Sequence, residues 1–68
     1  MDATTTWMNN IRNTVNEILA IVNTEGVISL GDAEAIATKH GATLPNALSE
    51  LQQRCHVDYA KGVIQCQS

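Results

Sequence analysis

The stretch VISLGDAEAIATKHG, residues 27–41, joins a strand signal directly to a helix signal. Its first two residues are β-branched, as strand residues often are, and predict a short strand at about residues 27–28. Ser29 stands three residues before Asp32, which is the spacing of a helix capping box. A helix is therefore expected over about residues 30–40, and the glycine that ends the stretch terminates it.

Downstream of this stretch, the segment LPNALSELQQR predicts a further helix over about residues 44–54. Pro45 is tolerated in its first turn because the amide hydrogen that proline lacks would have no partner there. Apolar residues recur at steps of three and four and form one inward face: Leu44, Ala47, Leu48, Leu51 and Cys55. The opposite face is polar and is open to a partner: Asn46, Ser49, Glu50 and Gln53.

The last alternating segment, VDYAKGVIQC, predicts a β-hairpin over about residues 56–66. A two-residue turn at Lys61-Gly62 would pair Tyr59 with Ile64. Side chains alternate between the two faces of a strand, so this register gathers the apolar side chains on one face. We therefore expect the hairpin to lie over the helices with Tyr59 buried beneath it.

Ahead of the opening stretch, the segment TTTWMNNIRNTVNEILAIVN predicts a long amphipathic helix over about residues 4–23. Its apolar residues form one stripe: Met8, Ile11, Val15, Ile18, Leu19 and Val22. The opposite face is polar but nearly uncharged. Trp7 and Ile21 lie beside the stripe, so we expect both side chains to be partly exposed.

The order helix, short strand, helix, helix, hairpin resembles that of the winged helix-turn-helix superfamily. VISLGDAEAIATKHG is similar to the strand and second helix of that superfamily, with Ala37 and Gly41 at its small residue and turn glycine. ALSELQQRCHVDY resembles the end of its recognition helix running into the wing. The likeness covers about Thr4 to Cys66 and implies one α+β domain over residues 1–68, with three helices, a short strand and a C-terminal β-hairpin wing. The presumed recognition helix is about one turn shorter than is usual in DNA-binding members.

The composition describes one small acidic domain of 68 residues with a formal net charge of −3. Nucleic-acid-binding modules usually carry a basic footprint, whereas this chain has four cationic side chains against seven carboxylates. A domain of this size often depends on a partner or a second copy, so a homodimer is one form we expect. The longest apolar run is far too short to cross a membrane, so we expect a cytoplasmic protein with no membrane segment.

The resemblance implies a small DNA-binding transcription regulator, as a dimer, with its third helix in the major groove and the wing along the backbone. The side chains that would contact DNA are Lys39, Asn46, Ser49, Gln53, Arg54 and Lys61. Asn and Gln can pair bidentately with adenine, and Arg with guanine or phosphate. Three phosphate contacts from one copy would give a salt slope of only about −2.7, so a monomer should bind weakly. Glu50 would lie near phosphates and oppose binding.

A protein-protein interaction module is the alternative function, as in a phage or plasmid accessory protein that inhibits or recruits a host complex. Aromatic side chains beside an uncharged polar face suit a protein interface, and the candidates here are Trp7, Met8 and Ile21. Two copies of the first helix could also pack together through these residues. The competing interpretation is that Trp7, Ile21 and Val63 simply complete the core of a small domain. The sequence leaves these alternatives open.

The cysteines and histidines invite a chemical interpretation, but their spacing does not favour one. Zinc sites usually offer paired ligands at tight spacing, which Cys55, His56 and Cys66 do not provide, so we expect no metal. Under the predicted turn the two cysteines are not directly opposite, so we favour two reduced thiols in the core over a disulfide. Cys55 and His56 are neighbours on a strand and point to opposite faces, which excludes them as nucleophile and base. We therefore expect a protein without catalysis and without a cofactor.

Overall fold

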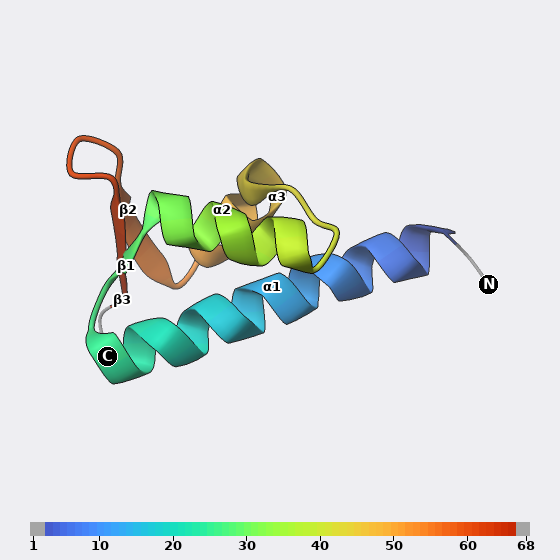
Figure 1. The fold of residues 1–68 in the computed structure, drawn as a ribbon, viewed down its shortest axis with the longest axis horizontal. Coiled ribbons are helices and arrows are strands. Elements are labelled where there is room, and N and C mark those ends of the chain that lie inside the picture. The colour runs from blue at the N-terminus through green and yellow to red at the C-terminus, as the bar shows by residue number, and fades with distance from the viewer. Residues whose placement is uncertain (1–2, 67–68) are drawn as a thin grey trace.

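The computed structural model describes residues 3–66 and arranges them as three helices and one three-stranded sheet. Figure 1 shows the sheet standing at one end of the molecule, with α1 running along its whole length. This α+β arrangement, with a C-terminal β-hairpin as the wing, is that of a small winged helix. The elements are α1 (Ala3–Glu25), β1 (Ile28–Ser29), α2 (Leu30–Lys39), α3 (Leu44–Leu51), β2 (Cys55–Asp58) and β3 (Val63–Cys66).

The sheet has the strand order β1-β3-β2, so the last strand lies in the middle. Strand β3 pairs antiparallel with both neighbours, placing Ile64 opposite Ile28 on one side and opposite Val57 on the other. The amide of Leu30 also donates a hydrogen bond to the carbonyl oxygen of Gly62, 2.8 Å away. This hydrogen bond links the wing to the start of α2.

The predicted hairpin register is wrong by two residues. Val57, not Tyr59, lies opposite Ile64, and residues 59–62 form the turn. Tyr59 is 63% exposed instead of buried. The longer turn is favoured by Asp58, whose carboxylate accepts a hydrogen bond from the amide of Lys61 and whose carbonyl accepts one from the amide of Gly62.

The observed register brings Cys55 directly opposite Cys66, and the two side chains form a disulfide. The prediction of two reduced core thiols is therefore wrong. It followed from the predicted turn, which did not place the two residues face to face. A shift of two residues conserves which face each side chain occupies, because side chains alternate with a period of two. The apolar face of the hairpin accordingly still packs on the helices, with Ile64 fully buried.

The core lies where α1, α2 and α3 meet the sheet. Ile18, Leu51 and Ile64 are fully buried there, one from α1, one from α3 and one from the central strand. The predicted stripe of α1 is confirmed from Ile11 onward, but Met8 is 54% exposed. Figure 1 gives the reason, because the N-terminal part of α1 extends beyond the ends of α2 and α3. Residues 4–9 are all exposed on this overhang.

The helix ends follow local signals. The Ser29 hydroxyl accepts a hydrogen bond from the amide of Asp32 at 3.1 Å, which caps the start of α2 as predicted. Helix α1 ends at Glu25, and Gly26 follows with a φ of 86°, a left-handed conformation that glycine adopts without strain. Helix α3 ends at Leu51 instead of about residue 54, because the next residues turn to deliver the chain into β2.

Candidate interaction groove between the first and third helices

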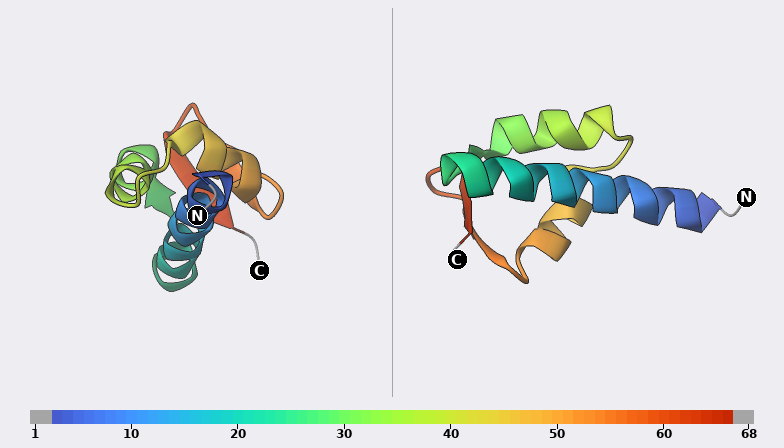
Figure 2. Two further views of the ribbon diagram at one scale, coloured as in Figure 1. Left: turned by 90° about the vertical axis from the view of Figure 1, so that its right-hand side faces the viewer. Right: turned by 90° about the horizontal axis from the view of Figure 1, so that it is seen from below.

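An open groove of about 620 Å³ runs between the N-terminal half of α1 and the outer face of α3. The α1 wall consists of Trp7, Met8, Ile11, Arg12, Val15 and Asn16. The other wall comes from α3 and the turn after it: Asn46, Ser49, Glu50, Gln53 and Arg54. The left view of Figure 2 looks down α1 from its N-terminal end and shows α3 passing beside that helix.

The α1 wall is apolar and incompletely covered. Trp7 and Met8 are 47% and 54% exposed, while Ile11 at the base of the overhang is 8% exposed. The two exposed side chains belong to the N-terminal segment of α1 in which residues 4–9 are all exposed, so the core gives them little cover. Trp7 therefore does not complete the core, in contrast to one of the two sequence-based interpretations.

The α3 wall is polar, and two of its side chains are held locally. The Asn46 amide donates to the Thr43 hydroxyl at 2.8 Å, and the Ser49 hydroxyl donates to the carbonyl oxygen of Pro45 at 3.3 Å. Glu50 and Gln53 are exposed. This wall thus presents hydrogen-bonding groups beside the apolar side chains of α1.

The charges of the groove are Arg12, Glu50 and Arg54, which sum to +1 in a chain of net charge −3. Within residues 3–66, both ion pairs engage Glu17, on the part of α1 that faces α2. Neither groove arginine takes part in them. Both arginines are exposed residues.

The structure brings together most of the residues that the sequence assigned to two different functions. Asn46, Ser49, Gln53 and Arg54, predicted to contact DNA, line the same groove as Trp7 and Met8, predicted to contact protein. Ile21 lies elsewhere, partly buried against the core, and Val63 is partly buried in the sheet. Sequence reasoning did not include Arg12 in either set, although it follows Met8 by one helical turn on α1.

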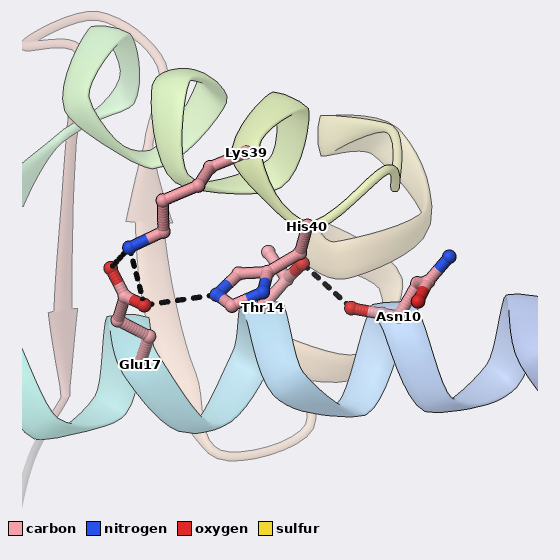
Figure 3. Close-up of polar contacts among 5 residues, drawn as sticks. All are labelled: Asn10, Thr14, Glu17, Lys39 and His40. Carbon is pink, nitrogen blue, oxygen red and sulfur yellow. Dashed lines mark hydrogen bonds and ion pairs between the residues drawn. The ribbon is translucent and has the colours of Figure 1, made fainter.

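Lys39 and Lys61 do not join this surface. The Lys39 ammonium binds both carboxylate oxygens of Glu17, at 2.7 and 2.8 Å (Figure 3). Lys61 lies in the wing turn beside the start of α2, at the opposite end of β2 from Arg54. Strand β2 alone separates these two ends by about 10 Å. Lys39, Arg54 and Lys61, the three cations among the predicted DNA contacts, therefore occupy separate parts of the molecule.

The contacts around Glu17 join α1 to the C-terminal end of α2. The imidazole Nε2 of His40 lies 2.9 Å from the carboxylate of Glu17, and Lys39 binds the same group (Figure 3). One turn earlier on α1, the buried Thr14 hydroxyl donates to the carbonyl oxygen of Asn10 at 2.8 Å. The hydrogen bonds from Lys39 and then His40 hold the pKa of Glu17 below its ordinary value.

Low pH should weaken the contacts of Glu17 with Lys39 and His40. A carboxyl group whose pKa is lowered by folding stabilises the protein above its ordinary pKa of 4.5, and that stabilisation is lost as the pH falls through the lower, folded value. We expect Glu17→Gln to remove this part of the acid sensitivity, giving a shallower fall of melting temperature below pH 4.5. Thermal melts over a pH series measure it, with Glu34→Gln, an exposed carboxylate on the same helix pair, as the control. Equal acid sensitivity of the wild type and Glu17→Gln would contradict the assignment.

The fold is that of a small winged helix, and an exposed groove lies beside its third helix. No family model, curated protein or solved structure matches the chain. Within residues 3–66, His, Cys, Asp and Glu side chains do not gather in groups of three that could hold a metal ion. None of the helices in that range combines the length and apolarity of a membrane span.

Proposed function

We propose that this chain is a non-enzymatic winged-helix module that binds another protein through the groove between α1 and α3. The observation that carries the proposal is the exposure of Trp7 and Met8, 47% and 54%, along one wall of that groove. Exposed apolar side chains that are gathered in one place mark interaction sites on small proteins. Trp, Met and Arg are also enriched in protein interfaces, and the groove contains all three.

The shape of the groove favours a long, continuous partner segment over a small molecule. Small-molecule sites enclose about 70–90% of their ligand's surface. Here most of the lining side chains are exposed, and the two walls come from α1 and from α3 with the turn after it. A third helix laid between two packed helices is a common arrangement, with axes about 8–10 Å apart. The groove thus resembles a seat for a helix of the partner.

DNA binding is the second candidate function, because Asn46, Ser49, Gln53 and Arg54 occupy the outer face of the helix that reads DNA in winged-helix regulators. The local charges support it less well. Glu50 lies among these residues, and Lys39 is already bound to Glu17. Phosphate contacts from Arg12 and Arg54 alone would give a salt slope of about −1.8 for one copy. Binding of that kind is weak at physiological ionic strength.

A pair of variants separates the two candidates. We expect Trp7→Ala combined with Met8→Ala to preserve the fold, because both side chains lie outside the core, and to weaken partner binding about 30-fold or more, as interface anchors do. Each immobilised protein is exposed to an extract of the cells that produce it, and the retained proteins are quantified. Tyr59→Ala, at the exposed wing turn, is the matched control.

The prediction is that the same proteins bind the wild type and Tyr59→Ala and are depleted on the groove variant. Equal retention by all three would show that the groove is not the binding surface. Retention that disappears on nuclease treatment, together with duplex binding that survives in the groove variant and is lost in Arg54→Ala, would favour the DNA function instead.

A further inference from the structure

Two arginines stand on opposite walls of the groove. Arg12 projects from α1 one helical turn after Met8, and Arg54 lies in the turn that follows α3. The ion pairs within residues 3–66 do not include either of them. A guanidinium group binds a carboxylate through two parallel hydrogen bonds, which makes Arg the preferred residue for carboxylates at interfaces. The groove therefore has an apolar wall with a cation available on each side.

The positions of Arg12 and Arg54 indicate which charges the partner carries. We propose, building on the function proposed above, that the groove receives an amphipathic α-helix of a different protein, with Asp or Glu beside its apolar stripe. The stripe packs on Trp7, Met8 and Ile11, and the flanking carboxylates meet Arg12 and Arg54. Glu50, which lines the same wall as Arg54, sets a further condition, because the partner side chain that faces it is neutral or cationic.

A second copy of this chain fits the groove poorly. The overhang it would insert, residues 3–11, contains no carboxylate for the arginines. An amphipathic helix of a different protein can supply both the carboxylates for Arg12 and Arg54 and the apolar stripe for the α1 wall.

Nucleic acid also supplies anions, but it leaves the apolar wall unused. Phosphates can pair with Arg12 and Arg54, yet a duplex backbone offers no apolar stripe to cover Trp7 and Met8. Covering apolar area provides most of the free energy in an association of this kind. An amphipathic helix uses both features of the groove.

Trp7 is the only tryptophan of the chain, so its fluorescence reports directly on the groove. The test uses the full chain and three probes. The first is a synthetic helix of about 18 residues, long enough to span the groove, with Leu on one stripe and Glu on both sides of it. The second has Lys in place of every Glu, and the third is a short DNA duplex. Each probe is titrated into the protein while the Trp7 emission is recorded.

The proposal predicts that the Glu peptide shifts the emission to shorter wavelength and binds about tenfold or more tightly than the Lys peptide. Equal binding of both peptides would overturn the acidic-partner inference and leave the groove as a protein-binding site. If only the duplex changes the emission, or no probe does, both the inference and the proposed function fail.

Charge reversal supplies the second readout. Arg12→Glu combined with Arg54→Glu should exchange the preference, so that the Lys peptide becomes the tighter ligand by roughly tenfold. Lys61→Glu, a reversal of the same sign at the wing turn, should leave the preference unchanged. A reversed groove that still prefers the Glu peptide, or an equal response to Lys61→Glu, would overturn the assignment of these two arginines.

Discussion

Reduction of the Cys55–Cys66 disulfide is expected to lower the melting temperature by roughly 10–20 °C. The bond closes a loop with a sequence separation of 11 residues at the open end of the hairpin. Closing a loop of this length restricts the unfolded chain and stabilises the native state by about 3 kcal/mol. The core of so small a domain contributes only about 3–5 kcal/mol net, so the cross-link is a large part of its stability.

Thermal melts followed by circular dichroism, with and without a phosphine reductant, measure this effect. The double variant Cys55→Ser with Cys66→Ser should melt like the reduced wild type and should not respond to reductant. A wild-type melting temperature that is unchanged by reduction would contradict the structure's account of the hairpin. Because disulfides persist in oxidising compartments and open in reducing ones, the stability of this protein should depend on where it is located.

Ile64→Ala is expected to be the most damaging single substitution in the core, at about 3–4 kcal/mol. Ile64 is fully buried on the central strand, where it lies between Ile28 and Val57. Truncating it leaves a cavity where the sheet meets the helices, and the neighbouring strands limit how far the site can collapse. A loss of this size is comparable to the whole stability of a small domain.

Urea denaturation of the variant and the wild type gives the change in free energy of unfolding. Val63→Ala is the matched control, since Val63 is the next residue on the same strand and is only partly buried. We expect the control to lose about 1 kcal/mol or less. If the two variants were equally stable, Ile64 would not be at the centre of the core.

Signals between residues close in sequence predicted most of the fold. The capping Ser29 and the spacing of apolar residues located all three helices, and the start of α2 was predicted within a residue. The hairpin register was not predictable in the same way. Two hairpin turns whose lengths differ by two residues place the same side chains on the same face of the sheet. The longer turn is favoured by the hydrogen bonds that Asp58 accepts, which the alternation of apolar residues does not indicate. The disulfide follows from the observed register, which places Cys55 opposite Cys66.

The groove depends on contacts between distant segments, which explains what the sequence could not predict. Periodicity placed Met8 in a buried stripe, but it cannot show where α2 and α3 stop covering α1. Lys39 was likewise predicted to contact DNA. Its ion pair with Glu17 could not be foreseen from the sequence, because the two residues are 22 positions apart. The two walls of the groove were each predicted as binding surfaces, and only the packing of α1 against α3 makes them one site.

The most direct test of the groove as the binding surface is an amide chemical-shift map of the full chain during titration with the Glu peptide. We expect the shifts to concentrate at the indole N–H of Trp7, along the first half of α1 and over residues 46–54, and the wing turn at residues 59–62 to stay unperturbed. Shifts confined to the wing turn, or spread evenly over the molecule with none at the Trp7 indole, would contradict it.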